Sequence, residues 1–270
     1  MKLKFGITGG TGSLGRNLIK NYKNIKFVKY RNDIRNKKKV FEWVIKNKFV
    51  AIIHLAAIVP IKIVNKNKKK AYQVNYEGTK NIVDATLKSE TEWFFFSSTS
   101  HVYRSSKKKI SENSIKKPIS FYGQTKYLSE KYIIKSYSNS KKKYCIGRIF
   151  STSNKNQKNN YLVPDLIKKI SNAKNTINLY NLNHYRDFIS MNEISKIIIR
   201  LYRVKFKGII NIGRGKKVYL KDIAKLVCKK YKKKYNFIDK KEPTYLIANN
   251  KKLKKIINLK NEINLRQTIF

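Results

Sequence analysis

Residues 3–15 read Leu-Lys-Phe-Gly-Ile-Thr-Gly-Gly-Thr-Gly-Ser-Leu-Gly, and the architecture of the chain can be built outward from them. The opening residues, Leu3–Thr8, form an apolar run of strand length that leads directly into a glycine-rich turn. Leu14 and Leu18 then stand four residues apart, as they would on one face of a helix. The stretch therefore predicts a strand, a tight turn and a helix in immediate succession.

The spaced glycines of this turn suit the binding of a dinucleotide. Gly9 permits the tight turn, Gly12 lets backbone N–H groups approach a pyrophosphate, and Gly15 allows the helix to pack close to the strand. A turn that binds no ligand is the alternative, but the position between a first strand and a first helix favours the cofactor. We expect the cofactor to be bound by Gly9, Thr11, Gly12, Ser13, Leu14 and Gly15.

Short apolar runs alternate with helix-period segments along most of the chain. The expected strands are Leu3–Thr8, Phe27–Tyr30, Val50–Leu55, Trp93–Ser97, Tyr144–Phe150 and Ile209–Ile212. Several are continuously apolar, which is typical of strands buried on both faces of a parallel sheet. Helical stripes follow at 194–201, with Asn192 as the expected N-cap, and at 220–227. The pattern predicts an α/β fold, a Rossmann doubly wound parallel sheet with a small interleaved C-terminal substrate lobe.

The regularity weakens after about residue 150, because residues 151–160 are polar and residues 240–270 are irregular. We expect an NAD(P)-binding domain over residues 1–150, with a return segment near residues 187–212. Residues 151–186 and 213–270 are expected to form the substrate-binding lobe.

The chain has 270 residues, and its 63 Lys+Arg against 15 Asp+Glu give a formal net charge of +48. Such a charge can indicate a nucleic acid or an anionic membrane as partner. The lysines are spread in short runs between apolar segments, however, so we interpret them as solvated and expect no specific nucleic-acid partner. No apolar run approaches the roughly 18 residues of a membrane span, and the opening residues do not resemble a signal peptide. A soluble, cytoplasmic protein is expected.

The cysteines and histidines do not indicate a metal site. Cys145 in an apolar strand and Cys228 on a helix are interpreted as buried small hydrophobes. His54, His101 and His184 are far apart in the sequence and lack metal-ligand spacing. His54 is expected at a strand end. His101 could line a substrate pocket, although a loop histidine is the simpler interpretation.

A phenol and an ammonium group stand four residues apart in Tyr122-Gly123-Gln124-Thr125-Lys126, so a helix would project both from one face. The adjacent cation would lower the pKa of the Tyr122 phenol from about 10. Upstream, the hydroxyl cluster Ser97–Ser100 follows an apolar strand, at the carboxyl end where open α/β sheets bind their ligands. Together these features predict acid–base chemistry beside the cofactor.

The end of the second strand bears on the choice of cofactor. It reads Lys29-Tyr30-Arg31-Asn32, without the acidic residue that would bind the ribose hydroxyls of NAD. Arg31 could pair with a 2′-phosphate instead, which favours NADP over NAD. A surface cation without this role is the alternative.

Further motifs lie along the chain between and after the glycine turn and Tyr122-x-x-x-Lys126. They are His54-Leu55-Ala56-Ala57, Asn75-x-x-Gly78-Thr79-x-Asn81, Ser97-Ser98-Thr99-x-x-Val102-Tyr103, Tyr185-Arg186-Asp187-Phe188-Ile189 and Asn211-Ile212-Gly213. With the glycine turn and Tyr122-x-x-x-Lys126, this order resembles the extended short-chain dehydrogenase/reductase family. Within that family it is similar to the NAD-dependent epimerase/dehydratase group, which acts on nucleotide sugars.

The resemblance implies roles for individual residues. Thr99 would hydrogen-bond the reacting sugar oxygen, Tyr122 would be the acid/base, and Lys126 would hold the nicotinamide ribose and tune Tyr122. Further cofactor contacts are implied for Asp33, Ile34, Leu55, Ala56, Ala57, Asn75 and Ser97. Substrate contacts are implied for Ser98, Thr99, Ser151, Val163 and Arg186. Dimerisation through a four-helix contact is usual in the family.

Departures from the family pattern narrow the expected reaction. Dehydratases of this group follow the threonine with Asp-Glu, whereas this chain has Ser100-His101, which disfavours sugar dehydration. The short chain is closer to the 4-keto-sugar reductases. We therefore expect an NAD(P)H-dependent reductase of a nucleotide-activated 4-keto sugar, with Tyr122 as proton donor. The alternatives are a 4-epimerase with retained NAD and a non-catalytic binder of dinucleotide or nucleic acid.

Overall fold

A six-stranded parallel sheet forms the centre of the computed structural model, which describes residues 2–152, 157 and 161–258. Its order is β10-β5-β4-β3-β1-β2, and every neighbouring pair is parallel. The strands are β1 (Lys4–Thr8), β2 (Lys26–Lys29), β3 (Ala51–His54), β4 (Trp93–Thr99), β5 (Lys143–Ile149) and β10 (Gly208–Ile212). The sequence therefore predicted all six strands, and the expected doubly wound Rossmann sheet is confirmed.

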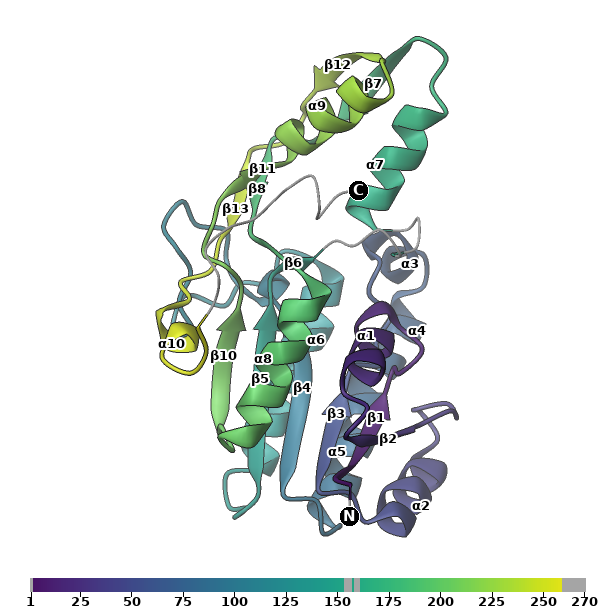
Figure 1. The fold of residues 1–270 in the computed structure, drawn as a ribbon, viewed down its shortest axis with the longest axis vertical. Helices are drawn as coiled ribbons and strands as arrows, with labels where there is room; N and C mark the ends of the chain where they lie inside the picture. The colour runs from purple at the N-terminus through teal and green to yellow at the C-terminus, as the bar shows by residue number, and fades with distance from the viewer. Residues whose placement is uncertain (1, 153–156, 158–160, 259–270) are drawn as a thin grey trace.

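Helices cover both faces of this sheet, as Figure 1 shows. On one face lie α1 (Ser13–Asn21) and α8 (Met191–Arg203); on the other lie α2 (Lys37–Asn47), α5 (Gly78–Leu87) and α6 (Phe121–Ser136). Strand β4 explains why both faces are apolar. Trp93 and Phe95 pack into the core under α1 and α8, whereas Phe94 and Phe96 pack into the core on the opposite side. Alternation along a strand thus buries a continuous apolar run on two faces.

Shorter elements connect β3, β4 and α6. The first connection contains α3 (Ile61–Lys66), α4 (Lys68–Tyr72) and a π-helical turn (Gln73–Glu77) that continues into α5. A 3₁₀ turn, Ser100–Val102, follows β4 directly. These connections begin at the carboxyl ends of β3 and β4. The candidate site described below lies at these two strand ends and at the carboxyl end of β1.

The expected N-cap of α8 was wrong. Ser190, not Asn192, caps the helix: its hydroxyl accepts from the Glu193 backbone N–H, and the Glu193 carboxylate accepts in return from the Ser190 backbone N–H. The Asn192 side chain instead accepts a hydrogen bond from Asn17 on α1, at 2.7 Å. A contact from the neighbouring helix thus gives this asparagine another role.

Three small sheets and two helices make up the upper part of the molecule in Figure 1. Their strands are β6 (Ser151–Thr152), β7 (Thr176–Tyr180), β8 (His184–Arg186), β9 (Phe188–Ile189), β11 (Val218–Tyr219), β12 (Lys234–Ile238) and β13 (Thr244–Leu246). The helices α7 (Leu162–Ser171) and α9 (Leu220–Lys230) pack together over a separate apolar cluster. A last short helix, α10 (Lys251–Lys254), returns to the central sheet, where Leu253 joins its core. Most of the polar segment 151–160 and the end 259–270 lie outside the described residues.

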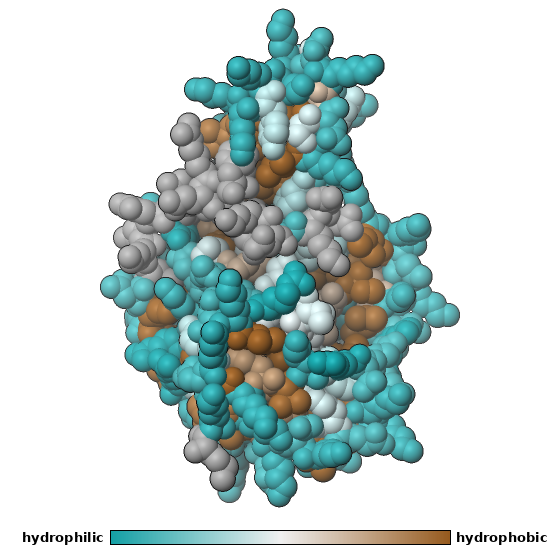
Figure 2. Space-filling view, turned by 45° about the vertical axis from the view of Figure 1, so that its right-hand side comes forward, coloured by the Kyte–Doolittle hydropathy of each residue, from teal (hydrophilic) through white to brown (hydrophobic). Residues whose placement is uncertain are grey.

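The surface is dominated by hydrophilic side chains. On the face shown in Figure 2 they cover most of the area, and hydrophobic residues gather in separate patches. The lysine runs at 37–39, 68–70 and 107–109 are exposed throughout. Both cysteines are free and buried, as expected. Within the part of the chain that the structure describes, no helix combines the length and the apolar character needed to cross a membrane.

Candidate active site

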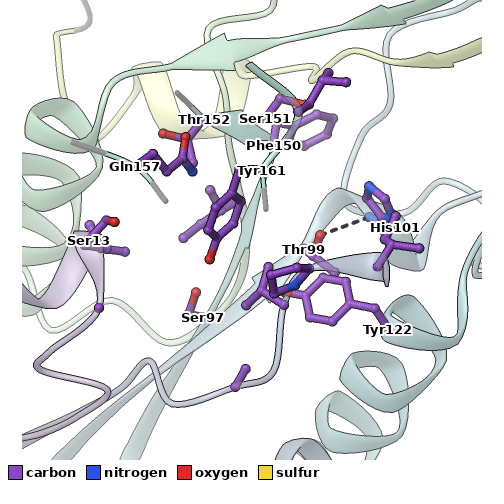
Figure 3. A pocket seen from close by; sticks show the side chains of 18 of the residues that line it. Ser13, Ser97, Thr99, His101, Tyr122, Phe150, Ser151, Thr152, Gln157 and Tyr161 are labelled. Atoms are coloured by element: carbon purple, nitrogen blue, oxygen red, sulfur yellow. Dashed lines mark hydrogen bonds between the residues drawn. The ribbon is translucent and has the colours of Figure 1, made fainter. Parts of the chain in front are cut away.

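A cavity of about 810 Å³ lies between the carboxyl ends of the central strands and the upper sheets. Figure 3 shows side chains from both parts around it, with Ser13 on one side and Thr99 and Tyr122 on another. The predicted site residues that line it are Gly9, Thr11, Gly12, Ser13, Leu14, Gly15, Leu55, Ala56, Ala57, Ser97, Ser98, Thr99, Tyr122, Ser151, Val163 and Arg186. The fold therefore brings most of the predicted site together, although Arg31, Asp33, Ile34, Asn75 and Lys126 are not in the cavity wall.

The glycine turn is shaped by close backbone approaches. Gly9 has a φ of 68°, and a Cβ there would lie 2.7 Å from the Ala56 nitrogen. A Cβ on Gly15 would lie 2.5 Å from the Gly9 oxygen, so the helix could not start so close to β1. Helix α1 has Gly12 as its N-cap, and no side chain caps its first amides. Those amides lie at the cavity, where their N–H groups can donate hydrogen bonds to an anion.

Thr99 and Tyr122 converge at the opposite side of the cavity. Thr99 ends β4, and Tyr122 lies in the first turn of α6, whose N-cap Ser120 accepts from the Gly123 N–H at 3.1 Å. Burial raises the pKa of the Tyr122 phenol above its ordinary value, and the neighbouring Thr99 hydroxyl opposes this rise. The expectation of a lowered phenol pKa was therefore wrong: desolvation outweighs the stabilisation of the phenolate.

Lys126 lies on α6 as predicted, but its ammonium group is directed into the protein. The Nζ atom stands 3.9 Å from the centroid of the Phe96 ring, and the residue is 1% exposed. Burial lowers the pKa of Lys126 to about 7, while the nearby Glu130 carboxylate opposes the change. The lysine therefore lies behind the cavity wall, with its ammonium group over an aromatic face and under the electrostatic influence of a carboxylate.

Ser98 belongs to the cavity wall, but its hydroxyl is directed to Glu130 on α6. Its hydroxyl donates to Glu130 at 2.5 Å, and Glu130 forms an ion pair with Arg148 at 2.6 Å. Both partners of that pair are buried. The substrate contact expected for Ser98 stays a prediction, although its hydroxyl is already engaged: in an alternating strand it points to the side opposite Ser97 and Thr99.

A directional chain of hydrogen bonds passes through His54 at the end of β3. Thr79 Oγ1 donates to the Asn75 carbonyl at 2.6 Å, so it accepts from His54 Nε2, 2.9 Å away. Burial, with the Lys126 charge, lowers the pKa of His54, so the ring is neutral and its Nδ1 accepts from Thr8 Oγ1 at 2.6 Å. Thr8 Oγ1 in turn accepts from the Ala56 N–H. This series of hydrogen bonds holds the start of the cavity-lining segment that follows β3, residues 55–58.

Asn75 holds the other end of this segment. Its side-chain oxygen accepts from the Ile58 N–H at 2.7 Å, and its side-chain nitrogen donates to the Ile58 carbonyl at 3.0 Å. The expected direct contact of Asn75 with the cofactor is thus corrected to positioning, because the amide is fully buried and engaged with the backbone. His54 and Asn75 together hold residues 55–58 against the cavity.

Asp33 and Ile34 are occupied elsewhere. Asp33 pairs with Arg35 at 2.6 Å, and this pair lowers the pKa of the Asp33 carboxyl. Ile34 packs so tightly on α5 that a Cβ on Gly78 would lie 2.5 Å from it. Arg31 is exposed. All three lie outside the cavity wall, so the predicted adenine and 2′-phosphate contacts stay predictions.

The upper sheets contribute a buried cation to the cavity. Arg186 on β8 donates to the Tyr185 and Thr244 carbonyls at 2.8 and 3.0 Å, and to the Thr244 hydroxyl at 2.9 Å. Burial lowers the pKa of Arg186 to about 10, and among the described residues it forms no ion pair. A cation without a counter-charge, in the wall of a cavity, favours an anionic ligand.

His101 and Tyr161, two residues of the cavity wall near Tyr122, were not among the predicted site residues. The sequence allowed His101 to line a substrate pocket but favoured a loop histidine, and the structure places it in the cavity wall beside Tyr122. Tyr161 approaches Tyr122 closely enough to raise its pKa further. Only the proximity of His101 to the hydroxyl cluster in the sequence could have indicated it. Among the described residues, no group of three or more His, Cys, Asp or Glu is placed to hold a metal ion.

Comparisons with known proteins agree with this geometry. The family model of the NAD dependent epimerase/dehydratase family matches residues 6–213. GDP-6-deoxy-D-talose 4-dehydrogenase of Aggregatibacter actinomycetemcomitans is 32% identical over 241 residues, which cover 84% of this chain and 79% of that protein. UDP-glucose 4-epimerase of Rhizobium meliloti (strain 1021) is 24% identical over 263 residues, covering 86% and 79%. The solved structure of Pal from Bacillus thuringiensis has a TM-score of 0.88 at 23% identity, over 99% of this chain and 96% of that one.

Proposed function

We propose, since this chain belongs to the NAD dependent epimerase/dehydratase family, that it uses a nicotinamide cofactor to reduce the 4-keto group of a nucleotide-activated sugar. One observation carries the proposal. A neutral phenol, Tyr122, lies beside the Thr99 hydroxyl in a cavity whose wall also contains the glycine turn and Arg186, a cation that forms no ion pair with any residue the structure describes. That arrangement combines a proton donor, a dinucleotide cradle and an anion site.

The glycine turn fits a dinucleotide. Side chains at Gly9 or Gly15 would collide with the backbone, and the uncapped start of α1 presents amides to a pyrophosphate. Residues 55–58, held by His54 and Asn75, form the wall beside it. When bound, the reduced cofactor supplies the hydride that attacks the carbonyl carbon.

The chain's own residues supply the proton. As the carbonyl carbon accepts a hydride, its oxygen gains negative charge and takes the phenolic proton of Tyr122, whose oxygen is left as a phenolate. The Thr99 hydroxyl lies beside Tyr122 in the cavity wall, where it can donate to the same oxygen as it gains charge. The raised pKa of Tyr122 keeps the phenol protonated at neutral pH, which supports a proton-donating role.

Arg186 supports a nucleotide diphosphate as the anionic part of the substrate. Its guanidinium is positioned by Tyr185 and Thr244 and keeps donor capacity for phosphate oxygens. The two relatives named above act on a GDP-sugar and a UDP-sugar, both at position 4. Both likenesses support a 4-position reaction on a nucleotide sugar here.

A 4-epimerase is the second candidate, because the relative from Rhizobium meliloti carries that name. The test supplies the purified protein with nucleotide-linked 4-keto and 4-hydroxy sugars and with each nicotinamide cofactor. Consumption of one NAD(P)H per sugar is expected for reduction. Conversion of a 4-hydroxy sugar without net change in the cofactor would indicate epimerisation, and no turnover in any combination would contradict both.

Arg31→Ala tests the proposed preference for NADP. If Arg31 contacts the 2′-phosphate, the variant should raise KM for NADPH by about tenfold, the effect of losing one charge-assisted contact, and leave KM for NADH unchanged. Initial rates with each cofactor measure this. Lys26→Ala, which removes an exposed cation on β2, serves as the matched control. An equal change for both cofactors would contradict a 2′-phosphate contact.

A further inference from the structure

His101 stands in the cavity wall beside the two hydroxyl groups of the proposed site. It lies in the 3₁₀ turn that follows β4, two residues after Thr99. Its ring meets the Tyr122 ring edge-on, with 6.1 Å between the ring centroids. Figure 3 shows His101 next to Thr99 and Tyr122 at the same side of the cavity.

The backbone of His101 is held from several directions. Its N–H donates to Thr99 Oγ1 at 3.3 Å, and its carbonyl accepts from the Ile119 N–H at 3.1 Å. Helix α6 also packs directly against it, because a Cβ on Gly123 would lie 2.3 Å from the His101 oxygen. A side chain on so constrained a backbone is positioned before any ligand arrives.

The tautomer of the ring follows from its neighbour Ser120. The Ser120 hydroxyl oxygen accepts from the Gly123 N–H, and among the described residues the only acceptor for its hydrogen is His101 Nδ1, 3.1 Å away, so we assign the Ser120 hydroxyl as the donor of this bond. Burial and the positive charge of Arg186 lower the pKa of His101 to about 4, so the ring is neutral at pH 7. A neutral ring whose Nδ1 accepts carries its proton on Nε2. In the described part of the chain, no residue accepts a hydrogen bond from this Nε2–H.

We infer that His101 is a specificity-determining residue, whose Nε2–H donates to a sugar oxygen next to the reacting carbonyl group. The inference rests on the proposed function. A carbonyl oxygen accepts two hydrogen bonds in its plane, and the Thr99 and Tyr122 hydroxyls are placed to supply them. A third donor beside that pair therefore serves a different oxygen, on a neighbouring carbon. His101 selects sugars that carry an acceptor there.

Two substitutions of His101 distinguish the contribution of Nε2 from that of Nδ1. His101→Gln places an amide N–H near the position of Nε2, whereas His101→Asn reaches only to Nδ1 and keeps the contact with Ser120. We expect His101→Asn to lower kcat/KM for the hydroxylated sugar by about 10–100-fold, the cost of a missing buried hydrogen bond. His101→Gln should retain most of the activity. With a deoxy sugar that lacks the neighbouring oxygen, all three proteins should have similar kcat/KM.

The outcomes distinguish this inference from the proposed function. If the wild-type protein turns over a nucleotide sugar and His101→Asn matches it, the role of His101 is overturned and the proposed function stands. If the wild-type protein turns over no nucleotide sugar, both are overturned. Nitrogen NMR of the histidine-labelled protein at pH 7 gives a readout independent of activity. A proton on Nε2 alone supports the inference, and a proton on Nδ1 contradicts it.

Discussion

Replacing Tyr122 by phenylalanine is expected to reduce turnover of the sugar by about 10²–10⁴-fold, the range for loss of a general acid. Phenylalanine keeps the ring that packs with Val64 and Ala71 in a buried cluster, and it removes only the oxygen that carries the proton. The loss should therefore fall on kcat, while KM and the thermal unfolding midpoint change little. Steady-state kinetics and thermal melts measure the three quantities.

Tyr127→Phe is the matched control for this substitution. Tyr127 lies on the same helix, is half-buried and is not in the cavity wall. It should keep wild-type kinetics. Retention of turnover by Tyr122→Phe would remove the proton donor from the proposed mechanism, and equal losses in the two variants would point to damage to α6 instead.

Lys126→Met is expected to have opposite effects on stability and on activity. Removing a buried ammonium group should stabilise the protein at pH 6 by about 1–4 kcal/mol, the range for replacing buried charges by apolar side chains. Glu130 is not left without a partner, because Arg148 and Ser98 still bind it. If Lys126 holds the nicotinamide ribose as predicted, turnover should fall at least tenfold. This loss corresponds to a rise of about 1.4 kcal/mol or more in the activation free energy.

The stabilisation should depend on pH in a defined direction. The pKa of Lys126 is about 7 in the folded protein and 10.5 ordinarily, so the unfolded chain binds more protons between these values. The wild-type protein therefore gains stability from this group as pH rises from 7 to 10.5, and the advantage of Lys126→Met shrinks. Denaturant unfolding at pH 6 and pH 10 measures the difference.

Lys131→Met is the control for this experiment, since Lys131 is an exposed lysine on the same helix. It should show no comparable dependence on pH. A Lys126→Met variant that is less stable than the wild-type protein at pH 6 would mean that the contact of the ammonium group with Phe96 and its attraction to the Glu130 charge outweigh its desolvation.

Local patterns in the sequence predicted the strands, the glycine turn and the helix of Tyr122. Each depends on residues that are close in the chain: apolar runs that form strands, glycines that allow a turn, and a spacing of four on a helix. The same locality explains the errors. The strand predicted over Trp93–Ser97 stopped short of the observed end of β4, so its alternation was not continued to Ser98. Asn192 was chosen as a cap without knowledge of its partner on α1, Asn17.

The amino-acid sequence alone determined the sheet, the cofactor turn and the presence of a hydroxyl pair near the strand ends, because short-range sterics and apolar periodicity set these features. Only the tertiary structure decided which way the polar groups face. The Lys126 ammonium group lies over Phe96, the Ser98 hydroxyl bonds Glu130, and the His101 ring bonds Ser120. Burial and hydrogen bonds between distant segments select these orientations, since a buried polar group must find whatever partner the packed fold offers.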